Sequence, residues 1–250
     1  SSPSRRREHR TRPRIHRHRP LPLHLGKSIE YLPNIHISAY NWRFDPQMET
    51  RIMSQQEHRI MLVSGSLRAA SATRVVLQRG REMLEELGCQ TDWVDLAVER
   101  LAIFNPDSSA REQQVQELRS RIVRADTFVL GTPDYHGGMS GGLKNFLDHF
   151  WHEFSGKLFV PLVASHEKGL TVVDQVLTVA RQCYAWSLPY SLSFVDGKDV
   201  REGKIMEPRL EQRLAMLARD VNVYGRLLAA QRASDLTGTD PGFLAARRHD

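Results

Sequence analysis

Two loops carry the residues best suited to chemistry in this sequence. The first, Gly65-Ser66-Leu67-Arg68-Ala69-Ala70-Ser71-Ala72-Thr73, follows a short apolar run and leads into an amphipathic stretch. A turn from a strand into a helix presents unpaired backbone N–H groups and the positive end of the helix dipole, and both favour a phosphate. Ser66, Ser71 and Thr73 add hydroxyl donors, and Arg68 adds a charged fork that can meet two phosphate oxygens.

This loop differs from the better-known phosphate-binding loops. It lacks the Lys-Ser/Thr pair of the nucleotide P-loop and the three spaced glycines of the dinucleotide fingerprint. A terminal monophosphate suits it better. Taken alone, the same residues are equally consistent with a plain turn in which Ser71 caps the helix and Arg68 is solvated.

The second loop runs from Gly131 to Asp148 and reads Gly-Thr-Pro-Asp-Tyr-His-Gly-Gly-Met-Ser-Gly-Gly-Leu-Lys-Asn-Phe-Leu-Asp. Pro133 stiffens the exit from the preceding apolar run, and the glycines allow backbone N–H groups to approach a flat ring. Tyr135 and His136 are placed to line such a ring. The alternatives are an aromatic side chain that covers a sheet edge and a surface imidazole.

The elements that must position these loops alternate between apolar runs and amphipathic stretches from Arg59 onward, which predicts repeated β-α units and a parallel sheet. Five strands are predicted, near 59–64, 91–96, 127–131, 158–164 and 191–195. Five helices are predicted, near 71–87, 110–124, 140–154, 172–186 and 209–231. We expect an α/β, doubly wound, five-stranded parallel sheet in the flavodoxin-like order 2-1-3-4-5, with a ligand crevice at the carboxyl ends of strands one and three.

The two loops together resemble the NADPH-dependent FMN reductase family, which includes quinone, azo-dye and chromate reductases on a flavodoxin-like fold. Members share a Gly-Ser-x-Arg-x-x-Ser-x-Asn/Thr loop, which is similar to Gly65–Thr73. They also share a Pro-Glu-Tyr-Asn/His-x-x-x-x-Gly-x-Leu-Lys-Asn-x-x-Asp loop, which is similar to Pro133–Asp148. The resemblance covers about residues 58–200, and the presence of two linked motifs makes it specific.

The resemblance implies roles for individual residues. The FMN phosphate would be held by Ser66, Arg68, Ser71 and Thr73. The isoalloxazine would be bordered by Pro133, Asp134, Tyr135 and His136. A third loop departs from the family's Gly-rich pattern and reads Ser165-His166-Glu167-Lys168-Gly169; Ser165 and Gly169 would still approach the flavin beside a bulkier, more charged rim. Three further residues would organise a helix start and a subunit contact: Lys144, Asn145 and Asp148.

The expected activity is that of an FMN-dependent oxidoreductase. Electrons would pass from NADPH or NADH through FMN to a small-molecule acceptor such as a quinone, a flavin or an azo compound. The resemblance also implies a homodimer or homotetramer with the flavin near a subunit boundary. The aromatic residues of the predicted helix 140–154 fit such a contact, and they fit ordinary packing on the sheet equally well; they are Phe146, Phe150, Trp151 and Phe154.

Two other functions are compatible with parts of the sequence. Gly138-Met139-Ser140-Gly141-Gly142 satisfies the Gly-x-Ser-x-Gly pattern of a serine hydrolase, but the long segment between Gly131 and Ser140 does not suit a tight nucleophile turn. A non-catalytic flavodoxin-like electron carrier or an FMN-bound regulatory module is the second alternative. Two features argue against it. Flavodoxins usually have a Thr-Gly-x-Thr phosphate loop without arginine, whereas this loop has Arg68, and they have a strongly acidic surface, whereas this body is nearly neutral.

Charge divides the chain. Residues 1–52 hold 11 of the 35 basic and 4 of the 29 acidic residues, which leaves 24 basic and 25 acidic residues for the rest. We therefore predict a basic, largely disordered extension (1–52), an FMN-binding domain (53–235) and a C-terminal tail (236–250). We expect no nucleic-acid partner, unless the basic extension provides the contact. Two cysteines without metal-binding spacing, and no apolar run long enough to cross a bilayer, predict a cytoplasmic protein without metal.

Overall fold

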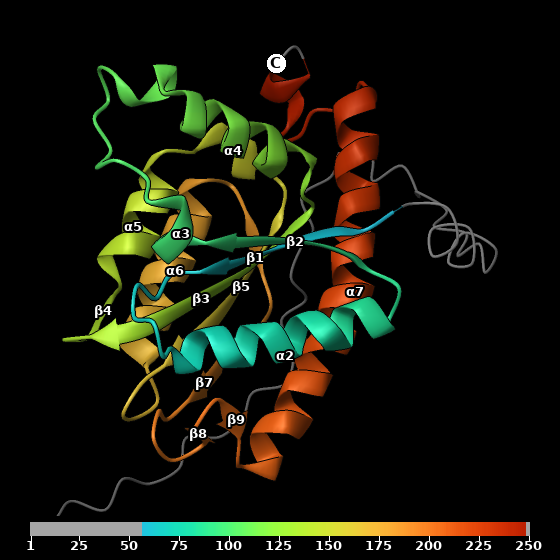
Figure 1. Cartoon of the computed structure of the whole chain (residues 1–250). Helices are drawn as coiled ribbons and strands as arrows, with labels where there is room; N and C mark the ends of the chain where they lie inside the picture. The colour runs from blue at the N-terminus through green and yellow to red at the C-terminus, as the bar shows by residue number, and fades with distance from the viewer. Residues whose placement is uncertain (1–56, 249–250) are drawn as a thin grey trace, which may run out of the picture. The chain divides into compact units, whose positions relative to one another are not determined.

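The apolar runs of the sequence form a mainly parallel β-sheet with helices on both faces (Figure 1). The computed structural model describes residues 57–248, which fall within one compact unit of the chain. The strands are β1 (Arg59–Ser64), β2 (Gln90–Asp95), β3 (Thr127–Tyr135), β4 (Gly138–Met139), β5 (Leu158–Ala164), β6 (Trp186–Ser187), β7 (Leu192–Phe194), β8 (Val200–Arg201) and β9 (Lys204–Ile205). The α-helices are α2 (Ala72–Glu86), α3 (Leu96–Glu99), α4 (Gln113–Arg124), α5 (Gly141–Asp148), α6 (Leu170–Gln182) and α7 (Pro208–Thr237).

Two hydrophobic layers sandwich the sheet, because successive side chains of a strand point to opposite faces. In β1, Ile60 and Leu62 pack in one layer with α2 and α7. Met61 and Val63 pack in the other layer with α4, α5 and α6. The doubly wound arrangement predicted from the alternating pattern is confirmed (Figure 1).

The strand order places the loops side by side. The main path of the sheet is β2-β1-β3-β5-β6, with β7 paired to β5, so the predicted order 2-1-3-4-5 is confirmed. Ser64 of β1 lies in register with Asp95 of β2 and with Gly131 of β3, and Pro133 lies in register with Ala164 of β5. The carboxyl ends of three adjacent strands therefore release the three predicted loops at one edge.

The strands differ from the prediction in three places. β3 continues beyond residue 131 to Tyr135, because Asp134 and Tyr135 pair antiparallel with β4. The fifth strand is divided into β6 and β7, and Pro189, which has no backbone N–H to donate to a ladder, lies in the gap. The hairpin β8–β9, which precedes α7, was not predicted.

The predicted helix 140–154 is shorter than expected. It ends at Asp148, and a separate 3₁₀ turn covers His152–Phe154. Phe146, Phe150 and Phe154 are buried in the core, where Phe154 packs edge-to-face on Phe128 at 5.1 Å between ring centroids. Sheet packing therefore explains these three aromatic residues and leaves Trp151, which is half exposed, for any contact with another subunit.

The ends of the predicted domain are described only in part. The basic extension 1–52 and the domain start at residue 53 lie outside residues 57–248. At the other end, α7 continues to Thr237, past the predicted boundary, and Leu244 of the predicted tail is buried. Among the helices of residues 57–248, none combines the length and apolar character that crossing a membrane requires.

A buried histidine joins α7 to the amino end of the sheet. His58 is 1% exposed, its Nε2 lies 2.9 Å from Thr127 Oγ1, and its ring fills the space beside Gly225 of α7. Burial, with a smaller contribution from the positive charge of Arg226, lowers the pKa of His58 from 6.5 to about 4. The folded chain therefore keeps this ring neutral where the unfolded chain protonates it.

This histidine predicts acid sensitivity. As the pH falls from 6.5 towards 4, the unfolded state gains a proton at His58 and the folded state does not, so the free energy of unfolding decreases by up to roughly 3 kcal/mol from this residue. Urea unfolding of the full chain at several pH values should show that the free energy of unfolding falls less steeply with decreasing pH in His58→Gln than in the wild type. Equal pH slopes for the two proteins would contradict this assignment; a constant offset would not.

Candidate functional site

The first loop gathers backbone donors at the start of α2. Gly65 N donates to Gly131 O at 2.8 Å, and Arg68 N donates to Ser66 Oγ at 3.4 Å. Within residues 57–248, five other loop N–H groups that precede α2 have no acceptor; they belong to Ser66, Leu67, Ala69, Ala70 and Ser71. The first-turn N–H groups of α2 cannot bond within the helix either. This edge of the sheet therefore offers a cluster of donors and the positive end of a helix to an anion.

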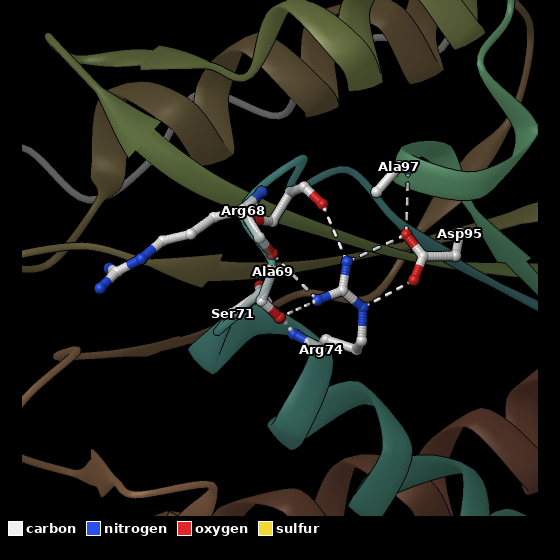
Figure 2. Close-up of polar contacts among 7 residues, drawn as sticks. Arg68, Ala69, Ser71, Arg74, Asp95 and Ala97 are labelled. Atoms are coloured by element: carbon white, nitrogen blue, oxygen red, sulfur yellow. Dashed lines mark hydrogen bonds and ion pairs between the residues drawn. The ribbon is translucent and has the colours of Figure 1, made fainter.

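The predicted side chains of this loop are placed differently from one another. Ser66, Ser71 and Thr73 are buried at the loop, and Ser71 caps α2 by accepting from Arg74 N at 3.2 Å. Arg68 extends away from them and pairs with Asp196 Oδ2 at 3.2 Å, with 65% of its side chain exposed (Figure 2). The helix cap considered above is therefore present, and Arg68 lies at the surface, paired with Asp196.

A second arginine, which the sequence analysis did not single out, lies under the loop (Figure 2). Arg74 Nε and Nη2 donate to Asp95 Oδ2 and Oδ1 at 2.6 and 3.1 Å. Its remaining donors reach three backbone oxygens of the loop, at 3.3, 3.0 and 2.9 Å; they are those of Ser66, Arg68 and Ala69. Both charged side chains are largely buried, at 24% and 12% exposure.

The second loop is an ordered hairpin. Asp134 and Tyr135 pair with Met139 and Gly138, and the turn between them has positive φ at His136 (57°) and Gly137 (76°). Two consecutive positive φ angles are typical of a type I′ hairpin turn. Asp134 Oδ1 accepts from Gly137 N at 2.8 Å and closes the turn. Tyr135 and His136 are exposed at its tip.

Two further side chains hold the hairpin in place. Asp134 Oδ2 accepts from Ser165 Oγ at 2.9 Å, which links the second loop to the third. Gln175 of α6 accepts from Met139 N and donates to Gly137 O, both at 3.0 Å. Gln175 escaped the sequence analysis because it is 36 residues from Met139 along the chain.

The third loop connects β5 to α6. Ser165 and Gly169 are buried, and Gly169 adopts a positive φ of 61° directly before α6. The three residues between them, His166, Glu167 and Lys168, are exposed. That these three side chains border a flavin site stays a prediction.

Lys144, Asn145 and Asp148, at the end of the segment predicted as the second loop, lie on α5. Lys144 pairs with Asp148 one helical turn away on α5. Asn145 accepts from Phe104 N at 2.8 Å and donates to Ala102 O at 2.9 Å, which fixes the segment that follows α3. These residues organise α5 and its surroundings, and their predicted subunit contact stays a prediction.

Ser140 joins the first loop to the second. Its Oγ donates to Gly65 O at 2.6 Å and accepts from Leu143 N at 3.1 Å as the N-cap of α5. Its backbone N donates to Thr132 Oγ1 at 2.9 Å. Since this buried hydroxyl contacts backbone groups and no basic side chain among residues 57–248, the geometry gives a hydrolase nucleophile no support.

This role predicts a measurable loss of stability. Ser140→Ala removes the cap of α5 and leaves Gly65 O without its donor, so the free energy of unfolding should fall by about 1–2 kcal/mol. Ser120, whose Oγ donates to Glu117 O on the exposed face of α4, is the matched control, and Ser120→Ala should change stability by less than about 0.5 kcal/mol. Equal effects of the two substitutions in urea unfolding would show that Ser140 does not connect the loops.

A comparison with known protein families shows which family the chain belongs to. Residues 58–199, more than half of the chain, match the family model of the NADPH-dependent FMN reductases. The chain belongs to this family. The predictions of an FMN-dependent oxidoreductase and of a nicotinamide reductant are thereby confirmed.

Characterised relatives carry related names. The chain is 29% identical over 153 residues to an NADPH azoreductase of Bacillus sp. strain OY1-2, an alignment that covers 60% of this chain and 83% of the relative. It is 34% identical over 94 residues to an FMN-dependent NADPH-azoreductase of Staphylococcus saprophyticus, covering 36% of this chain and 50% of that relative. The second match therefore spans half the length of the relative.

Solved structures confirm the flavodoxin-like fold. A flavoenzyme NAD(P)H:acceptor oxidoreductase from Paracoccus denitrificans aligns with a TM-score of 0.57 at 17% identity, over 68% of this chain and 97% of its own. An oxidoreductase from Corynebacterium diphtheriae aligns with a TM-score of 0.55 at 16% identity, over 70% of this chain and 98% of its own. An archaeal flavodoxin also aligns, with a TM-score of 0.50 at 10% identity, over 67% of this chain and 99% of its own. The fold alone therefore does not separate flavodoxins from oxidoreductases, whereas the family match does.

Proposed function

We propose that the three loops at the carboxyl edge of the sheet form the FMN site of an NAD(P)H-dependent reductase. The observation that carries this proposal is the cluster of backbone N–H groups of Ser66, Leu67, Ala69 and Ala70, which lack an acceptor within residues 57–248 and follow Gly65, the residue that bonds to Gly131 and Ser140 of the second loop. The phosphate ligands would be Ser66, Arg68, Ser71 and Thr73. The isoalloxazine would be bordered by Pro133, Asp134, Tyr135, His136, Ser165 and Gly169.

The residues present suit a flavin monophosphate. The loop supplies backbone donors, three hydroxyl side chains and a helix start to a dianion. Arg68 is exposed and makes a single ion pair, with Asp196, so its guanidinium can turn from that carboxylate to the phosphate. A Cβ atom at Gly65 would lie 2.8 Å from Gly131 O, so the two loops approach each other too closely for a side chain between them.

The second and third loops would hold the ring system. Asp134 already accepts from Gly137 N and Ser165 Oγ, so it would shape the pocket rather than contact the ring through a free carboxylate. Tyr135, 52% exposed at the hairpin tip, has room to stack on the ring. His136 beside it is placed to hold a proton for a quinone-like acceptor.

Bound FMN would accept hydride from the nicotinamide and return the electrons to an oxidised acceptor. We propose an azo compound, a quinone or a free flavin as that acceptor, on the support of the two azoreductase relatives. The exposed His166, Glu167 and Lys168 would face it. We further propose a homodimer or homotetramer in the cytoplasm; the thiols of Cys89 and Cys183, buried and unpaired, are consistent with a reducing compartment.

Arg68 gives the test of the phosphate site. Arg68→Ala removes a charged hydrogen bond, so the Kd for FMN should rise by about 10- to 150-fold, while binding of riboflavin, which has no phosphate, stays the same. Quenching of flavin fluorescence measures both affinities. Arg219, an exposed arginine paired with Asp220 on α7, is the control, and Arg219→Ala should bind FMN as the wild type does.

The possible failures of this test are distinct. A wild-type chain that does not bind FMN would contradict the proposed function itself. Normal FMN affinity in Arg68→Ala would instead remove Arg68 from the phosphate site and leave the backbone donors as its remaining ligands.

A further inference from the structure

Arg74 uses all of its donors inside the protein. A guanidinium carries five N–H bonds, and here they meet two carboxylate oxygens of Asp95 and the carbonyl oxygens of Ser66, Arg68 and Ala69 (Figure 2). No donor is left for a ligand. Although Arg74 lies within the first turn of α2, it cannot bind a phosphate unless these contacts break.

The three carbonyl contacts fix the direction of three peptide groups. In a trans peptide the carbonyl oxygen of one residue and the N–H of the next point in opposite directions. Holding the oxygens of Ser66, Arg68 and Ala69 on Arg74 therefore turns three N–H groups away from it, those of Leu67, Ala69 and Ala70. These three are among the N–H groups that have no acceptor within residues 57–248.

Asp95 anchors the arrangement to the sheet. It is the last residue of β2 and lies in register with Ser64 of β1. Its Oδ1 accepts from Ala97 N at 3.1 Å as well as from Arg74 Nη2. Its charge balances that of Arg74 beside a loop that is to receive an anion. Through Arg74, the loop is thus tied to the end of a strand of the sheet.

We propose that Arg74, held by Asp95, is a positioning residue that keeps the backbone donors of the loop directed at the FMN phosphate without touching it. This inference rests on the proposed function of the loop. It assigns separate roles to the two arginines: Arg68 binds the phosphate, and Arg74 orients the peptides that bind it.

Lysine is the informative substitution, because it keeps the charge but lacks the planar fork that reaches Asp95 and three carbonyls together. Arg74→Lys should raise the Kd for FMN at least about tenfold, because the loop N–H groups would no longer be held toward the phosphate. The Kd for riboflavin should change less than about twofold, because riboflavin has no phosphate for these groups to bind. Asp95→Asn should shift FMN affinity in the same direction, because it releases Arg74 from its anchor.

Arg121 provides a closely matched control. It donates to Asp92 Oδ2 and Oδ1 at 3.0 and 2.6 Å and to Trp93 O at 2.8 Å, so it makes a similar carboxylate and carbonyl contact on the same strand without reaching the loop. Arg121→Lys should leave FMN affinity within about twofold of the wild type. Urea unfolding of each variant reports any general loss of stability.

Each outcome has one meaning. Selective loss of FMN over riboflavin affinity in Arg74→Lys and Asp95→Asn, with Arg121→Lys unaffected, supports the proposal. Parallel loss of both ligands, or unchanged FMN affinity in Arg74→Lys, overturns it. Tighter FMN binding in Asp95→Asn also overturns it, since a freed Arg74 would then be a direct ligand. Absence of FMN binding by the wild type would contradict the proposed function instead.

Discussion

The proposed site depends on the register of three parallel strands, which end at the same edge of the sheet. Ser64, Gly131 and Leu162 share one register across β1, β3 and β5, so the loops that follow are neighbours although they are far apart in sequence. Hydrogen bonds then join them in pairs: Gly65 to Gly131 and Ser140, and Asp134 to Ser165. With that register changed, the three loops would no longer leave the sheet side by side.

Polar groups at the two ends of the sheet serve different purposes. At the amino end, Lys157 is 1% exposed and donates to the carbonyls of Ile122 and Val123, which end α4, at 2.7 and 2.8 Å. Together with His58 on Thr127, it leaves this end closed by internal hydrogen bonds. At the carboxyl end, backbone donors stay unpaired among the described residues, which is costly unless water or a ligand meets them. This difference supports the proposal that the carboxyl edge holds the FMN site.

Sequence patterns predicted the features that local chemistry determines. The strand order and the donor-rich turn before α2 follow from apolar periodicity and the residue types that begin helices, and the cap at Ser71 was the alternative that the sequence left open for that residue. Arg74 and Asp95 could not be found this way, because 21 residues separate them and only the pairing of β1 with β2 brings them together. The hairpin at Asp134–Met139 was expected as an open loop, since a two-residue turn through His136 and Gly137 lacks the usual Asn-Gly signal.

The most direct measurement is a crystal structure of the full chain with FMN bound. We predict phosphate oxygens within hydrogen-bond distance of the N–H groups of Leu67, Ala69 and Ala70, with the ring against Pro133–His136. Arg74 should remain on Asp95 and on the three loop carbonyls, with Arg68 turned from Asp196 to the phosphate. An FMN phosphate bound elsewhere, or an Arg74 that leaves Asp95 to contact it, would contradict the account.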